Sequence, residues 1–518
     1  MQIKIINLEV VLIGKFFNVF FLTNNEKTLF KEFSIDKNRS SKKILIQCVE
    51  DPFYFALFGT IIKAVVSKEK YCIEQYTARC LTYNGTKGVV NILKSIFLYN
   101  RFRDNKWIKL YSAYVNNVAY RQEGSTSVLK DILLLQKAYS IYKNLNSKDD
   151  ILNIKVDEIL IGDLIYDSYL RFKPEASVNI KDKYLCIVIW QALRNIDVAK
   201  KYFKRDKPKI LLTSYSTYIQ HGITVRIALS FGTKVYSFGN FKEFGKELTF
   251  EDYYHTVNCD DYYDNFSTLK DKTLLLKKAE TALTKRLHGY KDLATAYMKK
   301  SAYIVDKKLD MPDVKDKVVV FLHDFFDSPH IYGDMVFPDF LTWVETTIEI
   351  FEENNIPFIL KPHPNQIDDS AKVIKRLKKR YPNLQFVSPK ITNRQLVDGG
   401  IKLGVSVYGT VAHELVYMGV PIVLCGKNPH SSFNFIFEAK SLNEYNNLLQ
   451  NYLNLSIGKE KKYEVEAFYF MHNMNQSKET EDLMKMFIKL FYKYKQFEIY
   501  EKMQENKTFQ EFINKLIE

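Results

Sequence analysis

Cysteine is scarce in this chain, and close cysteine pairs are absent. Of 518 residues only six are cysteines, and no two of them form a C-x-x-C pair. Several stand inside apolar, strand-like runs. Isolated cysteines of this kind are typical of reduced core residues, so the sequence predicts a cytoplasmic protein without a disulfide framework.

Uninterrupted apolar runs of membrane-spanning length are also missing. The apolar stretch near the amino terminus, Ile3 to Leu22, is interrupted by Glu9 and Lys15, and no small-residue cleavage site follows it. A spanning helix needs about 20 consecutive apolar residues. We therefore interpret this stretch as a strand and hairpin within the fold, and not as a transmembrane helix or a signal segment.

No block of basic residues dominates, although positive charge is in excess. Lys and Arg number 75 against 60 Asp and Glu, which leaves a formal net charge of +15. Such an excess suits an acidic substrate or anionic lipid headgroups. Because the basic residues are dispersed, a nucleic-acid partner is not favoured. The charge leads us to predict peripheral contact with the anionic inner face of a membrane.

Material for buried cores is plentiful. Hydrophobic residues make up 46% of the chain and aromatic residues 14%. The length exceeds the usual size of a single core, so two α/β domains with one cleft between them are expected. A lysine-rich helical stretch ends in Asp310-Met311-Pro312-Asp313, just before a predicted strand over Lys317 to Leu322. We place the linker there.

Two polar clusters follow apolar strands in the second half of the chain. Phe358 to Leu360 is a short apolar run that predicts a buried parallel strand, and Lys361 and His363 come at its carboxyl end. Ile401 to Val407 predicts a second strand, which a tight turn joins to a helix over Val411 to Met418. Open α/β sheets bind ligands at the carboxyl ends of their strands, so we expect both clusters to face one ligand.

The side chains of these clusters suit a phosphate-bearing ligand. A lysine, an imidazole, the hydroxyls of Ser406 and Thr410 and a helix amino terminus are groups that hold phosphate. Glu414 lies one helical turn beyond Thr410, on the same side, where it would accept hydrogen bonds from ribose hydroxyls. Taken singly, His363 also fits a satisfied core histidine and Glu414 a solvated helix residue. Their joint occurrence at two strand ends favours a site.

These motifs resemble those of a known group of enzymes. Lys-Pro-His-Pro from Lys361, followed by Ser-x-x-Gly-Thr-x-x-x-Glu-x-x-x-x-Gly-x-Pro from Ser406, is similar to the nucleotide-binding half of GT-B glycosyltransferases. The pattern looks like that of the capsule-synthesis, bacterial sialyltransferase and Kdo-transferase groups, which carry a His-Pro motif. The resemblance covers about residues 316 to 430.

The resemblance implies a fold, a donor site and a set of ligands. The fold would be α/β of the GT-B type, with two Rossmann-like domains facing a central cleft and a C-terminal helix that returns to the first domain. It implies no bound metal or cofactor, and a CMP- or UDP-linked sugar as co-substrate. The donor-binding residues would be Lys361, His363, Ser406, Tyr408, Gly409, Thr410 and Glu414.

The first half of the chain offers candidates for catalysis. Glu158 to Gly162 predicts a strand, and Asp163 and Asp167 follow at its carboxyl end. A carboxylate at that edge would serve glycosyl transfer as a general base or nucleophile, whereas the alternative for Asp163 is a helix cap. His221 and Arg226, which follow a predicted strand over Lys209 to Thr213, are candidates for binding the acceptor or the leaving phosphate, and His221 is also a candidate for catalysis. A structural use of His221 fits equally well.

A loop after the strand Lys317 to Leu322 carries further polar residues. His323, Asp327 and His330 are the candidates for substrate binding there. Acids and histidines on one loop also suggest a metal site, but the loop lacks the helical His-x-x-x-His spacing of such sites. We therefore prefer a substrate-contacting loop without metal.

We predict a glycosyltransferase that moves a sugar from a nucleotide-activated donor to a capsule or lipopolysaccharide glycan, free or lipid-linked. The expected parts are an acceptor-side domain at 1–312, a nucleotide-sugar domain at 313–465 and C-terminal helices at 466–518. Two alternatives stay open, a CDP-polyol phosphotransferase of teichoic-acid type and a non-catalytic carbohydrate- or nucleotide-binding subunit.

Overall fold

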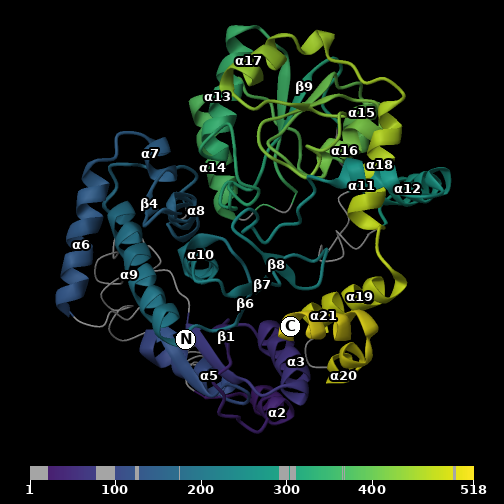
Figure 1. Ribbon diagram of the computed structural model, residues 1–518. Helices are drawn as coiled ribbons and strands as arrows, with labels where there is room; N and C mark the ends of the chain where they lie inside the picture. Colours follow the sequence, from purple (N-terminus) through teal and green to yellow (C-terminus); the bar gives the residue numbers. More distant parts are fainter. Residues whose placement is uncertain are drawn as a thin grey trace, which may run out of the picture. The chain divides into compact units, whose positions relative to one another are not determined.

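Two sheets of mainly parallel strands, one in each of two units of the chain, organise the fold (Figure 1). The computed structural model describes residues 21–77, 100–122, 128–173, 175–290, 303, 311–364, 366, 368–493 and 497–518. Unit 1 comprises Met1–Lys173, Ile180–His255 and Lys478–Glu518. Unit 2 comprises Pro174–Asn179 and Thr256–Ser477.

The sheet of unit 1 has six strands in the order β3-β2-β1-β6-β7-β8. Neighbouring strands are parallel except for β7 and β8, which are antiparallel. The five parallel strands follow the order of a Rossmann sheet, in which the third, second and first strands are followed by the fourth and fifth. The strands are β1 (Lys43–Cys48), β2 (Cys72–Thr77), β3 (Asn117–Arg121), β6 (Ile210–Thr213), β7 (Lys234–Ser237) and β8 (Lys246–Leu248).

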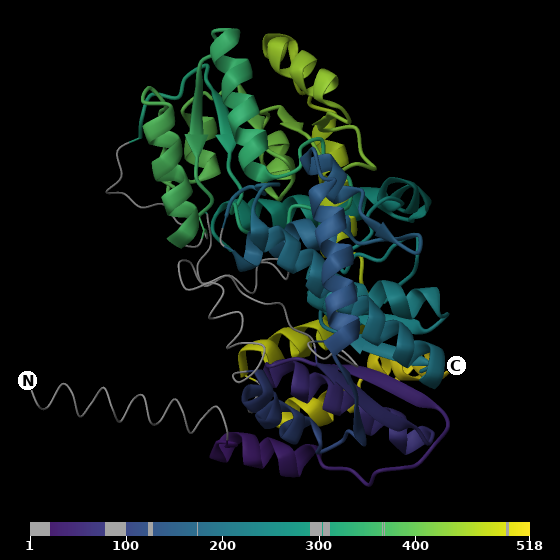
Figure 2. The same ribbon diagram turned by 90° about the vertical axis from the view of Figure 1, so that its left-hand side faces the viewer.

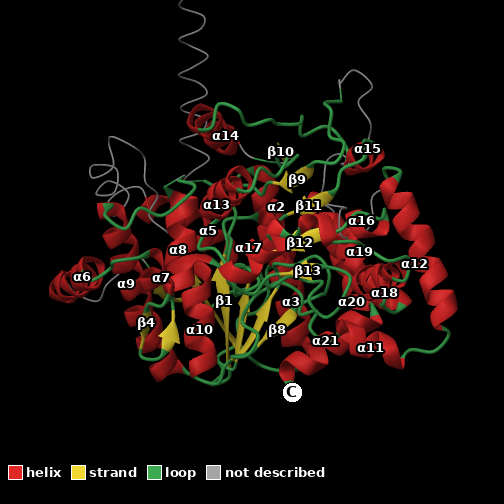
Figure 3. Ribbon diagram, turned by 90° about the horizontal axis from the view of Figure 1, so that it is seen from above, coloured by secondary structure: helices red, strands yellow, loops and turns green. Residues whose placement is uncertain are grey.

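Different helices cover the two faces of this sheet (Figure 3). α3 (Pro52–Lys68) shares one apolar cluster with alternate residues of β1 and β6, such as Ile44 and Ile210. On the other face, α10 (Ile223–Ser230) packs on β6 and β7, and α9 (Lys183–Asp206) packs on α10. The further helices of this unit are α2 (Asn24–Phe33), α5 (Asn100–Tyr111), α6 (Val128–Lys143), α7 (Lys148–Leu152) and α8 (Gly162–Phe172).

The last three helices return to unit 1, as predicted. They are α19 (Lys478–Lys493), α20 (Phe497–Glu505) and α21 (Lys507–Ile517), and all three contact α3 (Figures 1 and 2). Phe487 of α19 is fully buried, with its ring centroid 5.3 Å from that of Phe53 and 5.6 Å from that of Phe244. These helices therefore complete the core of the first unit.

Unit 2 has a parallel sheet in the order β10-β9-β11-β12-β13. This is the second common order of doubly wound sheets, in which the first strand lies between the second and the third. The strands predicted over Lys317 to Leu322, Phe358 to Leu360 and Ile401 to Val407 are confirmed, and the helix α13 covers Phe340–Glu353. The strands are β9 (Val318–Phe321), β10 (Phe358–Lys361), β11 (Leu403–Val405), β12 (Ile422–Leu424) and β13 (Phe437–Glu438).

Helices cover both faces of this sheet as well. α13, α14 (Asp368–Arg380) and α17 (Leu442–Gln450) bury their apolar residues in one cluster. α15 (Asn393–Asp398), α16 (Val411–Tyr417) and α18 (Lys461–Asn473) contribute to the cluster on the opposite face. The predicted fold class is therefore confirmed: the chain is an α/β protein with two Rossmann-like units and C-terminal helices that belong to the first.

The contacts divide the chain after His255, whereas we had predicted a boundary at residues 312 and 313. α11 (Tyr262–Thr268) and α12 (Lys272–Leu287) belong to unit 2, where both pack on α18. Their residues Phe266 and Leu283 are buried in the same cluster as Val465. The many lysines of α12 conceal this narrow apolar stripe in the sequence.

The predicted strand Glu158 to Gly162 is wrong. β5 (Ile159–Leu160) pairs only with β4 (Lys155–Val156), antiparallel and outside the main sheet. Asp157 and Glu158 join the two strands with φ of 48° and 64°. A two-residue hairpin turn needs two positive φ angles and usually carries glycine or asparagine, so the sequence hid this turn.

The structure tests the predictions on the amino terminus and on the cysteines only in part. Residues 1–20 and Cys80 lie outside the described residues. The other five cysteines are free thiols, of which four are buried. None of the helices in the described ranges has the length and apolar character needed to cross a membrane.

Candidate functional site

The centre of the candidate site is the point in unit 2 where the strand order reverses, between β9 and β11. In open α/β sheets, ligands bind outside the carboxyl ends of the two strands at this point. His323 follows β9 and Ser406 follows β11. The Ser406 hydroxyl oxygen lies 3.2 Å from His323 Nε2, so the two predicted site residues meet across the reversal.

The hydrogen bonds of His323 determine which of its ring nitrogens carries the proton. The backbone N–H of Tyr408 donates to Nε2 over 3.4 Å, which makes Nε2 an acceptor and places the proton on Nδ1. The ring stacks on Phe340 with a centroid distance of 4.5 Å and an interplanar angle of 11°. Burial, and then the nearby His363, lower the His323 pKa to about 3. His323 is therefore a neutral, rigidly held imidazole.

The residues of the turn after β11 have different roles. Gly409 has φ of +117°, a conformation that favours glycine. Thr410 is exposed and its hydroxyl caps no backbone group of α16. Tyr408 is buried, and its hydroxyl donates to the carbonyl of Ser328. Of these predicted donor contacts, Thr410 presents its side chain to solvent and Tyr408 supports the ring of His323.

Lys361 lies at the end of β10, as predicted, but its side chain is 6% exposed and points to a neighbouring element. Its Nζ donates to Asn393 Oδ1 over 3.1 Å. Burial lowers the Lys361 pKa to about 8, while the nearby Glu414 carboxylate opposes this effect. The amine therefore belongs to a buried polar network.

Glu414 is the anion of this network. This role differs from the ribose contact that the resemblance implied for Glu414. Arg286 donates from Nε and Nη2 to Glu414 Oε1, over 3.1 and 2.9 Å. Asn393 Nδ2 donates to Oε2 over 3.0 Å, and the Tyr303 hydroxyl donates to the same oxygen. Both carboxylate oxygens are engaged and the residue is 2% exposed, so Glu414 holds α16 against α12 and α15.

His363 stands two residues beyond β10, at the same edge as His323. Burial lowers its pKa, Asp324 raises it, and Lys361 lowers it again. Asp324 in turn accepts hydrogen bonds from Ser370 Oγ and the Phe326 N–H. A second neutral imidazole thus adjoins the first, and the predicted proximity of His363 and Ser406 to one strand-end region is consistent with the topology.

Asp327 and His330 are the other two predicted site residues of the loop after β9. Asp327 is exposed and its carboxylate accepts from the Ser328 N–H, while His330 is buried. Within the described residues, no group of three or more His, Cys, Asp and Glu side chains is arranged to hold a metal ion. The residue types at the strand ends fit an anionic organic ligand.

A pocket of about 340 Å³ adjoins the strand ends of β12 and β13. Gly426 forms part of its wall, and a Cβ placed there would lie 3.3 Å from Val407 Cγ1, next to Ser406. The pocket therefore continues the edge that carries His323 and Ser406. Its lining residues are Asp334, Met335, Val336, Gly426, Lys427, Ser431, Glu438, Ala439 and Lys440.

Glu438 is one of two acidic residues that line this pocket, and sequence reasoning missed it. Its Oε1 accepts from Ser431 Oγ over 2.6 Å and from Asn428 Nδ2 over 2.8 Å. Burial raises its pKa, while Ser431, Lys440 and Lys427 oppose this effect. β13 has only two residues, so no apolar run in the sequence marked Glu438 as a strand-end residue.

Unit 1 has its own polar cluster where its strand order reverses, between β1 and β6. Gln47 of β1 accepts on Oε1 from Thr213 Oγ1, the Ser214 N–H and Ser214 Oγ, over 2.8 to 3.0 Å. These donors fix its amide, so Gln47 Nε2 donates to His221 Nδ1 and the His221 proton is on Nε2. Gln220 Nε2 lies 2.9 Å from that Nε2, and since an amide nitrogen only donates, the Gln220 amide must turn its oxygen to this N–H to accept from it.

His221 is therefore a fully engaged neutral residue. Burial, and then the nearby His255, lower its pKa to about 3. A general base needs a free lone pair, and the only one on this ring already accepts from Gln47. The structure favours the structural use of His221 over the catalytic one.

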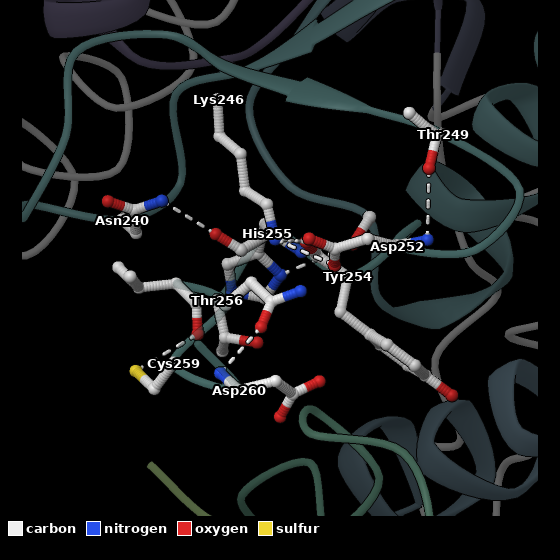
Figure 4. A network of polar contacts seen from close by, with 12 residues as sticks. Asn240, Lys246, Thr249, Asp252, Tyr254, His255, Thr256, Cys259 and Asp260 are labelled. Carbon is white, nitrogen blue, oxygen red and sulfur yellow. Dashed lines mark hydrogen bonds and ion pairs between the residues drawn. The ribbon is translucent and has the colours of Figure 1, made fainter. Parts of the chain in front are cut away.

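His255 is a second imidazole at the same edge, and the sequence did not single it out. The backbone N–H of His255 donates to Ser216 Oγ over 2.8 Å, and its backbone carbonyl accepts from Asn240 Nδ2. Burial lowers its pKa to about 4. Figure 4 shows Asn240 pointing to this residue, with Lys246 donating nearby to Asp252 and to the carbonyl of Tyr254.

Asp163 and Arg226, proposed for catalysis and acceptor binding, instead form an ion pair with each other. Arg226 Nη1 donates to Asp163 Oδ1 over 2.7 Å, and Nη2 donates to Oδ2. The two side chains are 6% and 3% exposed, and the guanidinium lies 4.3 Å from the centroid of the Tyr253 ring. Asp163 is not at a strand end but in the first turn of α8, and Asp167 is buried one turn later.

Comparisons with known proteins give distant structural similarities only. No protein-family model and no curated protein matches the sequence. The structure is similar to a UDP-GlcNAc 2-epimerase from Methanocaldococcus jannaschii in complex with UDP-GlcNAc and UDP, at 10% identity and a TM-score of 0.24, covering 82% of this chain and 97% of that one.

It is also similar to KpsC, a beta Kdo 2,7 transferase from Thermosulfurimonas dismutans, at 13% identity and a TM-score of 0.32, covering 57% of this chain and 89% of that one. A glycosyltransferase from Rickettsia africae matches at 10% identity and a TM-score of 0.26, covering 89% and 99% of the two chains. Similarities at this level do not assign a function.

Proposed function

We propose that this chain is a glycosyltransferase that takes a sugar from a nucleotide-activated donor bound by unit 2. The observation that carries the proposal is the His323–Ser406 pair at the strand-order reversal, with Nε2 and the hydroxyl 3.2 Å apart. This is where doubly wound sheets bind nucleotides. His363, which follows β10, the strand beside β9, adds a second imidazole to the same edge.

The phosphate of the donor would be held mainly by neutral hydrogen-bond donors. His323 offers its Nδ1–H, and Thr410 offers an exposed hydroxyl. When the bond between sugar and phosphate breaks, negative charge builds up on the leaving phosphate. Donors fixed in place before the reaction stabilise that charge without reorganisation.

The nucleoside would occupy the pocket at β12 and β13. Glu438 has one oxygen held by Ser431 and Asn428, which orients the carboxylate to accept hydroxyl groups with the other. This arrangement gives Glu438 the ribose contact that we had expected from Glu414. We keep CMP- and UDP-linked sugars as the proposed donors, and independence of metal as an implication of the resemblance.

The acceptor is assigned to unit 1, at the polar edge around Ser216 and His255. The proposed acceptor is a glycan of bacterial capsule or lipopolysaccharide, free or lipid-linked. This part rests on the resemblance of the Lys361 and Ser406 motifs and on the polar strand ends of the first sheet.

A donor panel tests the proposal. The purified chain is incubated with CMP-sugars, UDP-sugars and CDP-glycerol, and nucleotide release is measured with and without oligosaccharide acceptors. We expect release from one class of CMP- or UDP-linked sugar, increased by acceptor and lost in His323→Phe. Release from CDP-glycerol alone would point to the polyol phosphotransferase, and binding without release from any donor would point to a non-catalytic subunit.

A further inference from the structure

The helix α6 carries an unusual amount of exposed apolar surface. Every other helix in the described part of the chain has at most one large, exposed apolar residue, whereas α6 has five. They are Leu129, Ile132, Leu133, Leu135 and Tyr139, exposed by 69, 48, 52, 39 and 53%. Scattered exposed residues need no explanation, but a cluster on one helix marks an interaction surface.

Spacing puts most of these residues on one side of the helix. Leu129, Ile132, Leu133 and Tyr139 follow intervals of three, four and seven residues, which align side chains along a helix. Ala138 is fully buried, and α6 packs on α9. Within unit 1, α6 lies on the outside of α9 in Figure 1, and Figure 2 shows α6 in front of it. The outer side of α6 is therefore not covered by α9.

The contacts of α6 with α9 hold it firmly in this orientation. Asp131 Oδ1 forms an ion pair with Arg194 Nε over 2.9 Å, and the Asp131 carbonyl accepts from Trp190 Nε1 over 3.1 Å. Lys130 pairs with Asp197 over 3.5 Å. The apolar residues are therefore presented by an anchored helix.

Charge indicates what covers this surface. Asp131 is the only acid on α6, and its charge is matched by Arg194. Lys137 and Lys143 are exposed beside the apolar residues, and Lys143 Nζ lies 5.6 Å from the Tyr139 ring centroid. Apolar and basic residues together on one helix are typical of helices that lie in the interface of an anionic membrane.

We propose that α6 is the membrane-contact element of this protein, with Leu129, Ile132, Leu133 and Tyr139 inserted among anionic lipids. Lys137 and Lys143 then face the lipid headgroups. A second copy of the chain is a poorer occupant, because two such faces would bring like charges together. The proposal is independent of the donor site, which lies in unit 2.

Vesicle sedimentation of the full chain tests this assignment. We expect binding to vesicles of phosphatidylcholine with phosphatidylglycerol, little binding to phosphatidylcholine alone, and a decrease at high salt. Leu129→Ser/Leu133→Ser should weaken binding at least about tenfold, because much of the inserted area is lost. Lys137→Gln/Lys143→Gln should weaken it by about 25-fold, since each of the two lysines near the surface contributes about fivefold.

Matched controls separate α6 from general surface effects. Leu274→Ser removes a leucine with 53% exposure from α12, and Lys372→Gln/Lys375→Gln removes two exposed lysines from α14. Both should bind vesicles as the parent does, and all variants should keep the parent's thermal unfolding. Equal binding by parent and α6 variants, or no binding to anionic vesicles, overturns the proposal. So does a dimer in light scattering that Leu129→Ser/Leu133→Ser abolishes, because α6 is then covered by a second copy.

Discussion

At the scale of single residues, the site in unit 2 depends on an imidazole that stays neutral. His323 accepts from the Tyr408 N–H on Nε2, so only its Nδ1–H is available to a ligand. His323→Phe keeps an aromatic ring to stack on Phe340 but removes the donor. A hydrogen bond to a charged group contributes roughly 1.5–3 kcal/mol, so we expect nucleotide affinity to fall about 10- to 100-fold in calorimetry.

The control for this experiment is His288→Phe, which alters an exposed histidine elsewhere in unit 2. It should bind nucleotide as the parent does. Because the His323 pKa is about 3, affinity for a nucleotide-sugar should also stay level between pH 5.5 and 7.5. A steep gain in affinity at the lower pH would show that a histidinium binds the phosphate, contrary to this account.

The ion pair of Asp163 and Arg226 makes a prediction about stability. Asp163→Asn leaves the buried guanidinium without its counter-charge, and breaking a buried pair from one side costs about 3–5 kcal/mol. We expect a loss of this size in urea unfolding, with nucleotide affinity unchanged because the donor site lies in unit 2.

The double variant Asp163→Leu/Arg226→Met should recover much of that stability, since apolar replacements of a buried pair are often tolerated. Parental stability of Asp163→Asn together with a large loss of turnover would restore Asp163 as the catalytic carboxylate.

Lys361 predicts a pH dependence of stability. Its pKa is about 8 in the folded chain, against a usual value of 10.5. Between these values the unfolded chain binds more protons than the folded one, so the contribution of Lys361 to the free energy of unfolding rises with pH. Relative to Lys361→Met, the parent should gain up to about 1.4 kcal/mol per pH unit between about pH 8 and 10, as measured by urea unfolding.

At the scale of helices and strands, the sequence was informative where apolar runs are long and clearly bounded. β9, β10, β11 and α16 all lie where their patterns predicted. The prediction of short elements failed for a physical reason. β5 and β13 have two residues each, which is too few to show a periodicity. In the β4–β5 turn, Asp157 and Glu158 adopt positive φ angles, which neither residue type indicates in a sequence.

The candidate site was predictable to the same degree. Strand ends follow from strands, so the positions of His323, His363 and Ser406 at strand ends were predictable, whereas their roles as ligand contacts stay predictions. Which side chains pair with one another depends on contacts far apart in sequence. Arg286 engages Glu414 from 128 positions away, and Arg226 engages Asp163 from 63 positions away. No local pattern reveals such partners, so both carboxylates were assigned roles that the structure gives to buried ion pairs.

The C-terminal helices give a prediction at this scale. Phe487 of α19 is fully buried against Phe53, Phe241 and Phe244. Phe487→Ala should destabilise unit 1 by about 3–5 kcal/mol, because the removed ring leaves a cavity in a packed core. Urea unfolding, monitored through hydrogen exchange in peptides from β1 and β6, measures this loss of stability. Tyr492→Ala is the control, since that ring, on the same helix, is 48% exposed.

At the scale of the whole molecule, two sheets with separate cores share one chain, and the proposed function divides its substrates between them. A nucleotide alone should therefore act on unit 2 only. In hydrogen exchange, we expect a bound nucleotide to protect peptides that cover 358–364, 403–411 and 436–441, which contain His363, Ser406 and Glu438. These segments form the edge and pocket at the carboxyl ends of β10, β11 and β13, and a ligand there removes their amides from solvent exchange.

Peptides from unit 1 that cover 210–222 serve as the internal control. They include the strand end of β6 and the cluster around His221, which we assign to the acceptor side, so their exchange should stay unchanged with nucleotide. Protection of 210–222 without protection of 403–411 would move the nucleotide to unit 1. Because the two sheets reverse their strand order at equivalent places, only such a measurement on the intact chain distinguishes the two assignments directly.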